Sequence, residues 1–285
     1  MIRFTKMHGL GNDYLVIDAM EKLPVAEEKL GALSKALSDR HFGVGADGII
    51  LVLPSRAADF RMRILNSDGS EAEMCGNGVR LFAKYLYEHG LTREKELQLE
   101  TLAGIIGPRL RVDGGEVKSV KVDMGEPRLR RAEIPMKGPD SSRVVAEKLR
   151  VAGKQVVITA VSMGNPHCVL FVDDVERAEV ATLGPAIAHH DLFPRRTNVE
   201  FVRVVGETEL EMRVWERGAG ETLACGTGAS AALVAAVLNE KSQRKVTMHL
   251  RGGDLAVSWA ENNHVFIDGP AAEVCTGESR LDEGL

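Results

Sequence analysis

The amino-acid sequence predicts an α/β protein made of two copies of one unit, in which strands predominate and a central helix is enclosed by sheet. Three observations support this. The chain has 285 residues, more than one domain usually contains. Its short β-branched or alternating runs outnumber its helical stretches. A C-G-x-G motif occurs twice, at Cys75 and at Cys225.

Nine short runs predict the strands. Each is β-branched or alternates between apolar and polar residues over a few positions. The runs are Leu15 to Asp18, Ile49 to Leu53, Arg61 to Leu65, Leu97 to Leu99, Val156 to Val161, Val169 to Val172, Val199 to Val204, Leu210 to Val214 and Val265 to Ile267.

Three stretches predict helices: Ala26 to Leu37, Val79 to Tyr87 and Ala229 to Leu238. The third is apolar on nearly every face. A helix of this kind cannot lie on a protein surface. We therefore expect it to be enclosed by sheet in the centre of its domain.

An internal repeat supports the division into two halves. Cys75 to Gly78 and Cys225 to Gly228 share the C-G-x-G pattern at an offset of 150 residues. Other landmarks follow in the same order: Glu71 with Glu221, Asn66 with Glu216, Gly48 to Val52 with Asn198 to Val202 and, after a small slip, Gly11-Asn12 with Gly164-Asn165. Such self-similarity indicates two copies of one α/β unit.

The boundary between the halves is expected near Asp123 to Pro127, where Gly125 and Pro127 interrupt the strand pattern. This predicts a first domain over residues 1–125 and a second over 126–270. We expect the last segment, 271–285, to return to the first domain as a strand.

Composition argues against several kinds of partner. The net charge is −5 and the basic residues are dispersed, so nucleic acid is not expected. The first ten residues have no apolar signal region, and no apolar run reaches the ~18 residues of a membrane span. We expect a cytoplasmic protein without a membrane partner, whose four cysteines are free thiols.

The two C-G-x-G motifs are the candidate catalytic centres. Each is expected to open a helix, whose N-terminal N–H groups bind an anion and lower the pKa of an adjacent thiol. If the domains pack face to face, Cys75 and Cys225 can converge on one cleft. One thiolate could then remove a proton from a stereocentre while the other thiol returns one. Alternatively, the cysteines are inert and closely packed, or they form a structural disulfide.

Other polar residues have two possible roles. Asn66 lies in a sequence that forms a turn whatever the function. Glu216 and Arg217 could be an exposed ion pair or could hold an amino group and a carboxylate. His167 could be a capped turn residue or could tune a thiol.

The sequence does not support two common kinds of binding site, a dinucleotide site and a metal site. Gly43 to Gly48 fits G-x-G-x-x-G, but a predicted strand follows it instead of the required helix. The eight histidines show no metal-ligand spacing, so no metal site is expected.

Taken together, these motifs resemble the diaminopimelate epimerase family over the whole chain. The segments that carry the resemblance are His8 to Asp13, Arg40 to Gly43, Asn66 to Gly69, Cys75 to Gly78, Ser162 to Cys168, Asn198 to Glu200 and Glu216 to Gly228. Some members have a glutamine where this chain has Gly48.

The resemblance implies epimerisation of LL- to meso-2,6-diaminopimelate, for lysine and peptidoglycan synthesis, by a homodimer without pyridoxal phosphate or another cofactor. It implies two pseudo-symmetric domains, each a curved sheet around a central helix, with Cys75 and Cys225 as the acid and base. It implies that His167 and Glu216 adjust their pKa values. The carboxylate-binding residues would be Gly76, Asn77, Gly226 and Thr227, and the rest of the substrate would contact Asn12, Asn66, Asn165, Asn198, Glu216 and Arg217.

Three other functions remain open. Proline and hydroxyproline racemases and epimerases also use two thiols, but proline lacks the second amino-acid end that Glu216 and Arg217 would hold. A non-catalytic amino-acid-binding protein would tolerate Cys75→Ala. A thiol-redox protein is less favoured, because neither cysteine belongs to a C-x-x-C pair.

Overall fold

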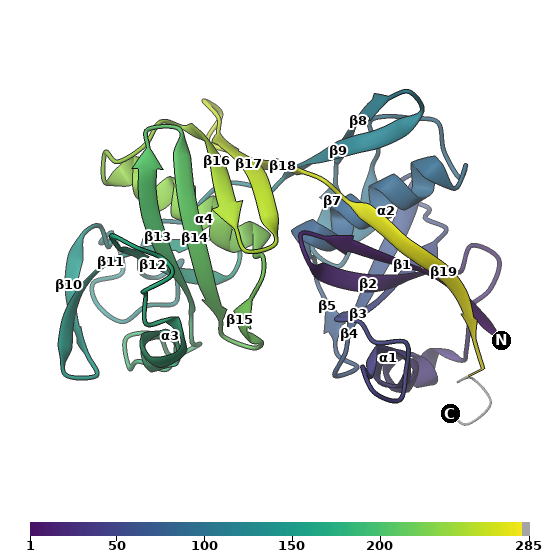
Figure 1. Ribbon diagram of the computed structural model, residues 1–285, viewed down its shortest axis with the longest axis horizontal. Coiled ribbons are helices and arrows are strands. Elements are labelled where there is room, and N and C mark those ends of the chain that lie inside the picture. The colour runs from purple at the N-terminus through teal and green to yellow at the C-terminus, as the bar shows by residue number, and fades with distance from the viewer. Residues whose placement is uncertain (281–285) are drawn as a thin grey trace. The chain divides into compact units, whose positions relative to one another are not determined.

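The computed structural model describes residues 1–280 and has a mixed α/β fold (Figure 1). The chain forms two compact units. Unit 1 consists of Met1–Val122 together with the segment from Gly269 onward, and unit 2 is Asp123–Asp268. Residues 281–285, the end of the segment expected to return as a strand, lie outside the described residues.

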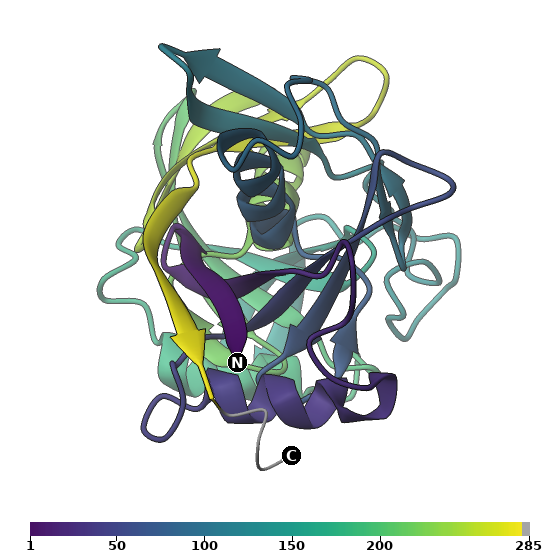
Figure 2. The same ribbon diagram turned by 90° about the vertical axis from the view of Figure 1, so that its right-hand side faces the viewer.

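Unit 1 is built on an eight-stranded sheet in the order β19-β1-β2-β3-β4-β6-β7, with β5 paired to β4. Its strands are β1 (Ile2–Gly9), β2 (Asn12–Asp18), β3 (Gly48–Leu53), β4 (Phe60–Asn66), β5 (Glu71–Ala72), β6 (Leu99–Thr101), β7 (Gly104–Ile106) and β19 (Ala272–Ser279). The pairs β2–β3 and β4–β6 are parallel. Figure 2 shows β19, in yellow, running beside β1, in purple, with which it pairs antiparallel.

A hairpin and three helical segments complete unit 1. The hairpin joins β8 (Arg109–Asp113) to β9 (Glu116–Asp123). The helical segments are η1 (Glu27–Lys29), α1 (Leu30–Ser38) and α2 (Gly76–Glu88). Helix α1 buries Leu30, Leu33 and Leu37 in a core that includes Ile49 and Leu51. A Cβ atom at Gly78 of α2 would instead meet Ile50. Because side chains alternate along a strand, α1 and α2 cover opposite faces of β3.

Unit 2 has the strand order β10-β11-β12-β13-β14-β16-β17-β18, with β15 paired to β14. The strands are β10 (Glu147–Val151), β11 (Lys154–Ser162), β12 (Pro166–Phe171), β13 (Asn198–Gly206), β14 (Glu209–Glu216), β15 (Gly220–Thr222), β16 (Lys245–Leu250), β17 (Gly253–Trp259) and β18 (Val265–Gly269). Its helices are α3 (Val180–Ala188) and α4 (Gly226–Leu238).

Helix α4 is the enclosed helix that the sequence predicts. Its residues Ala229 to Ala236 are all buried, and it packs against strands β11, β12, β13, β14, β16 and β17. The small and aliphatic side chains allow this enclosure on all sides. Among residues 1–280, no helix combines the length and apolar character needed to cross a membrane.

The internal repeat is also present in the strand register. In unit 1, Tyr14 of β2 lies opposite Gly48 of the parallel strand β3. In unit 2, His167 of β12 lies opposite Asn198 of the parallel strand β13. A third strand follows in each unit, and then a helix that begins just after a cysteine. The two halves are therefore pseudo-symmetric, and the predicted fold class is confirmed.

The structure corrects some predicted boundaries. The strand expected at Leu97 to Leu99 runs instead over Leu99–Thr101, and the strand expected to reach Val172 ends at Phe171. Helix α3 has no counterpart in the sequence analysis. It contains Pro185, which normally argues against a helix interior.

Candidate active site

Each C-G-x-G motif opens a helix with its cysteine as the N-cap, as predicted. Cys75 caps α2 with φ −140° and ψ 118°, and Cys225 caps α4 with φ −133° and ψ 112°. The Gly78 N–H donates to Cys75 Sγ at 3.5 Å, and the Gly228 N–H donates to Cys225 Sγ at 3.4 Å. Both sulfur atoms thus occupy the position where a helix stabilises negative charge.

The last glycine of each motif permits close packing beside the thiol. A Cβ atom at Gly228 would lie 3.0 Å from Oε1 of Glu200 and 3.3 Å from Sγ of Cys225. At Gly78 the corresponding neighbours are Ile64 at 3.3 Å and Ile50 at 3.4 Å. A side chain at Gly228 would therefore displace either a carboxylate or the sulfur itself.

In unit 1, the predicted site residues Asn12 and Asn77 lie next to Cys75. Asn77 Nδ2 donates to Asn12 Oδ1 at 3.2 Å, and Cys75 Sγ lies 3.8 Å from the same oxygen. The Tyr14 hydroxyl lies 3.9 Å from Cys75 Sγ and donates to it. Asn12, Cys75 and Asn77 therefore form one cluster, to which the structure adds Tyr14.

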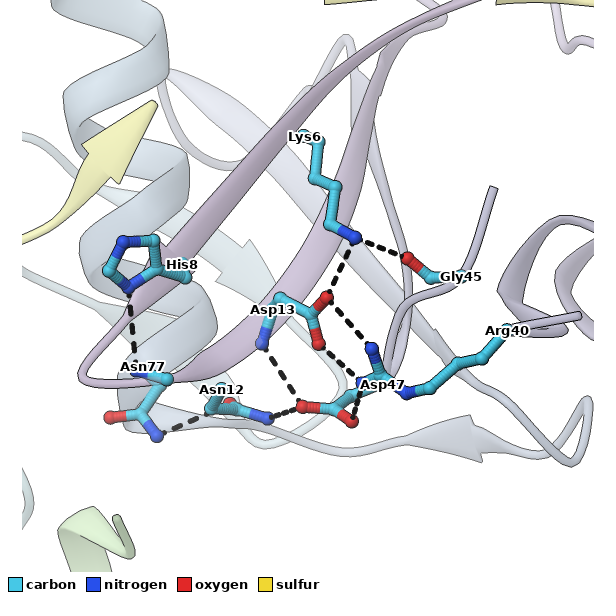
Figure 3. Close-up of polar contacts among 9 residues, drawn as sticks. Lys6, His8, Asn12, Asp13, Arg40, Gly45, Asp47 and Asn77 are labelled. Atoms are coloured by element: carbon cyan, nitrogen blue, oxygen red, sulfur yellow. Dashed lines mark hydrogen bonds and ion pairs between the residues drawn. The ribbon is translucent and has the colours of Figure 1, made fainter. Parts of the chain in front are cut away.

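A charged network fixes the orientation of Asn12 (Figure 3). Asn12 Nδ2 donates to Asp47 Oδ2 at 2.7 Å, and Arg40 bridges Asp47 and Asp13. Lys6 also pairs with Asp13, at 3.1 Å. Since an ionised carboxylate only accepts hydrogen bonds, Asp47 directs the Asn12 carbonyl toward Asn77 and Cys75. Asp13, Asp47 and Lys6 are not among the site residues that the sequence predicts.

The charges of this network favour an ionised Asp13. Burial alone would raise the pKa of its carboxyl, but hydrogen bonds from Arg40 and Lys6 and their positive charges outweigh burial. The pKa of Asp13 is therefore lowered.

Asn66 lies at the end of β4, in the turn that the sequence predicts. Its Nδ2 donates to Ser70 Oγ at 3.0 Å. It is paired in register with Gly48 of β3, which in turn is opposite Tyr14 of β2. Asn66 is therefore two strands from Tyr14, at the same end of the sheet.

In unit 2, a chain of hydrogen bonds links His167 to Cys225. His167 Nε2 lies 2.9 Å from Asn165 Oδ1, and Asn165 Nδ2 donates to Thr227 Oγ1 at 3.2 Å. Thr227 Oγ1 lies 3.5 Å from Cys225 Sγ. His167 thus reaches the thiol through two intervening side chains.

Glu200 completes this chain and was missed as a site residue. Its Oε1 lies 2.6 Å from His167 Nδ1, and both side chains have no exposed surface. Burial raises the pKa of Glu200, and the nearby His167 opposes that rise. A polar residue amid the apolar run of β13 was the available signal, because a buried carboxylate needs a partner.

The pKa of Cys225 is raised well above the usual thiol value. Burial is the largest cause, followed by the negative charges of Glu216 and Glu200. The hydrogen bonds from Thr227 and from the Gly228 N–H act in the opposite direction. The helix N-terminus was expected to lower this pKa, but burial and two carboxylates outweigh it.

The other predicted residues of unit 2 lie at the ends of β13 and β14. Asn198 is buried, and its Oδ1 accepts the Arg217 N–H at 2.9 Å. Glu216 Oε1 accepts from the Thr222 hydroxyl at 2.6 Å. The Arg217 guanidinium is exposed and donates to the Arg195 carbonyl at 3.1 Å.

None of the four cysteines, all of which lie within the described residues, forms a disulfide bond. Cys168 is completely buried, which raises the pKa of its thiol, whereas Cys275 is exposed on β19. Within residues 1–280, no group of three or more His, Cys, Asp or Glu side chains is arranged to hold a metal ion.

Comparison with known proteins gives consistent matches. The diaminopimelate epimerase family model matches residues 4–130 and 159–278. A diaminopimelate epimerase of Moorella thermoacetica is 58% identical over 283 residues, covering 99% of this chain and 100% of that protein. One of Pelotomaculum thermopropionicum is 56% identical, covering 97% of this chain and 98% of that protein.

Solved structures of lower identity share the fold. A probable proline racemase from Agrobacterium radiobacter superimposes with a TM-score of 0.72 at 16% identity, covering 100% of this chain and 94% of that one. A PhzF-family phenazine biosynthesis protein from Bacillus anthracis gives a TM-score of 0.71 at 17% identity, with 98% of each chain covered.

Proposed function

The chain belongs to the diaminopimelate epimerase family, and on this premise we propose that Cys75 and Cys225 interconvert LL- and meso-2,6-diaminopimelate without a cofactor. The enzyme is an isomerase. The observation that carries the residue assignment is the equivalence of the two cysteines, since each caps a helix and accepts the N–H three residues later. Such duplication suits inversion at one carbon by a two-base mechanism, with one proton carrier for each face.

In the proposed reaction, a thiolate removes the α-proton and the opposite thiol delivers a proton to the other face. The raised pKa of Cys225 favours its protonated thiol form. Cys75 would then begin the reaction as the base, and the roles are reversed for the opposite direction. The negative charges of Glu216 and Glu200 raise the pKa of Cys225. His167 would influence the same thiol through Asn165 and Thr227.

The carboxylate at the reacting carbon would bind to the two helix N-termini. Gly76 and Asn77 lie in the first turn of α2, and Gly226 and Thr227 lie in the first turn of α4. Backbone N–H groups and the helix dipole favour an anion there. They also stabilise the negative charge that develops when the α-proton leaves, which lowers the barrier without an electron sink.

The second amino-acid end of the substrate would be held by polar side chains around the two motifs. Arg217 and Glu216 provide opposite charges for a carboxylate and an ammonium group. The remaining contacts would come from amide side chains, whose orientation is already fixed at Asn12 by Asp47 and at Asn198 by the Arg217 N–H. They are Asn12, Asn66, Asn165 and Asn198.

The same family membership supports three further parts of the proposal. The reaction would supply meso-diaminopimelate for lysine and peptidoglycan synthesis, in the cytoplasm. The protein would act as a homodimer, which sedimentation at micromolar concentration tests directly.

The proposed function is tested by incubating the protein with LL-diaminopimelate in deuterated water. NMR measures the deuterium incorporated, and chiral chromatography measures the inversion. Wild type is compared with Cys75→Ala and Cys225→Ala, and the exposed Cys275→Ala serves as a matched control. We expect wild type and the control to invert one centre with solvent deuterium at the α-carbon, and the other two variants to lose inversion.

Two results would count against the proposal. No exchange by reduced wild-type protein would contradict the substrate, and proline and hydroxyproline would then be tested. Inversion that survives in Cys75→Ala or Cys225→Ala would contradict the two-thiol mechanism.

A further inference from the structure

The two cysteines have different neighbours at equivalent positions of the repeat. His167 on β12 and Tyr14 on β2 correspond, because each lies opposite the first residue of the adjacent parallel strand, Asn198 or Gly48. Glu200 on β13 likewise corresponds to Ile50 on β3. The imidazole–carboxylate pair of unit 2 is thus replaced in unit 1 by a phenol and an aliphatic side chain.

Tyr14 directly contacts the sulfur of Cys75. The Tyr14 side chain is largely buried, with only 5% of the residue exposed. Its hydroxyl lies 3.9 Å from Cys75 Sγ, within hydrogen-bond distance of a sulfur acceptor. By contrast, His167 is linked to Cys225 through Asn165 and Thr227.

Gly48 leaves space for the tyrosine ring. A Cβ atom at Gly48 would lie 3.0 Å from Tyr14 Cε1 and 2.3 Å from the Leu65 carbonyl oxygen. The second distance is too short for any side chain without movement of the backbone. The glycine therefore allows the ring to lie close against β3, with its hydroxyl in contact with Cys75.

The surroundings keep Tyr14 protonated and able to donate. Burial raises its pKa well above the usual value for a phenol, and the adjacent Cys75 and then the Asp47 carboxylate raise it further. Asn12 acts in the opposite direction. The groups that shift this pKa come from β2 itself (Asn12), from the N-cap of α2 (Cys75) and from the loop before β3 (Asp47).

We propose that Tyr14 is a positioning residue for Cys75, whose hydroxyl donates a hydrogen bond to Sγ and favours the thiolate on that face of the substrate. This inference rests on the proposed two-thiol reaction. A donor held against the sulfur stabilises the anion more than the thiol. Unit 1 therefore tunes its thiol with a direct phenol contact, whereas unit 2 uses an imidazole–carboxylate pair at a distance.

The test compares wild type with Tyr14→Phe, which removes only the hydroxyl. The rate of Cys75 alkylation by iodoacetamide is measured against pH, with peptide mass spectrometry assigning the modified cysteine. Tyr87→Phe is the matched control, because Tyr87 lies farther along α2 and the chemical change is the same. Circular dichroism and a thermal melt check that each variant is folded.

We expect the midpoint of Cys75 alkylation to move upward by roughly one pH unit in Tyr14→Phe, a tenfold change in the thiol–thiolate equilibrium. The control should keep the wild-type midpoint. We also expect kcat for epimerisation to fall severalfold in Tyr14→Phe, with a smaller change in KM. An unchanged midpoint in folded Tyr14→Phe protein overturns the inference.

Alkylation requires no substrate, so the two proposals fail separately. If the midpoint moves but wild type does not epimerise diaminopimelate, the Tyr14 contact is real and the proposed function is wrong. If wild type epimerises and the midpoint stays, only the role of Tyr14 is wrong.

Discussion

Nδ1 of His167 lies 2.6 Å from Oε1 of Glu200, and neither side chain has any exposed surface. Within the part of the chain that the structure describes, the second carboxylate oxygen of Glu200 has no hydrogen-bond partner. Nε2 of His167 faces the Asn165 carbonyl oxygen and is therefore its donor. The pair consequently holds one proton between Nδ1 and Oε1.

The first prediction concerns the stability of this pair. In Glu200→Leu, the buried imidazole loses its partner, and we expect the free energy of unfolding to fall by about 1–3 kcal/mol. Glu200→Gln retains an amide that can accept or donate, so its loss should be smaller. Urea denaturation measures both. Glu211→Gln, which removes a partly exposed ion pair with Arg203, is the control and should change little. Equal stability of Glu200→Leu and wild type would contradict the inferred pairing.

The second prediction concerns the close packing behind Cys225. In Gly228→Ala, the new methyl group would lie 3.0 Å from Glu200 Oε1 and 3.3 Å from Cys225 Sγ. We expect kcat to fall by about ten- to a hundredfold, because a reacting group displaced by a fraction of an ångström loses its alignment. Steady-state kinetics provides the measurement. Gly206→Ala, whose methyl group would meet nothing within 4 Å, should remain fully active.

The third prediction concerns acid stability. The pKa of Asp13 is lower in the folded chain than in the unfolded chain, because Arg40 and Lys6 overcome the effect of burial. Its contribution is therefore present above the unfolded value of about 4 and is lost as the pH falls toward the lower folded value. Asp13→Asn should show a shallower loss of stability than wild type between about pH 4 and 2. Chemical denaturation at several pH values tests this.

The exposed Asp113→Asn variant is the control for the acid series. We expect its pH dependence to match that of wild type. The stability of Asp13→Asn could instead fall with the same slope as that of wild type at acid pH. That result would show that the network around Asn12 does not hold the Asp13 carboxylate in its charged form.

The fourth prediction concerns recognition of the second amino-acid end. In Arg217→Met, an exposed guanidinium is removed while the backbone N–H that Asn198 accepts remains. We expect KM for diaminopimelate to rise about tenfold or more, with a smaller change in kcat, since the contact is far from the reacting carbon. Arg203→Met on β13 is the matched control. An unchanged KM in Arg217→Met would remove this residue from the proposed site.

Several features were determined by local sequence. Two cysteines followed by Gly-x-Gly predicted two helix starts, and both helices begin there because a capping acceptor and small residues fit the first turn. The apolar character of Ala229 to Ala236 required burial on all sides. The repeat offset also placed Gly48 and Asn198 in equivalent strands.

Other features depended on contacts between distant segments. Strand β19, in the segment expected to return to the first domain, pairs with β1 across most of the length of the chain. Its residues are largely exposed and do not alternate between apolar and polar, so its register with β1 could not be predicted. The environments of the thiols are likewise tertiary. Tyr14 has the character of an ordinary strand residue, and Glu200 is a polar residue in an apolar run whose partner the sequence does not identify. Only the register of β2 with β3 and of β12 with β13 places them near the two cysteines. Sequence periodicity thus determined which segments are buried, whereas strand pairing decided which polar groups meet there, because pairing depends on residues far apart in the chain.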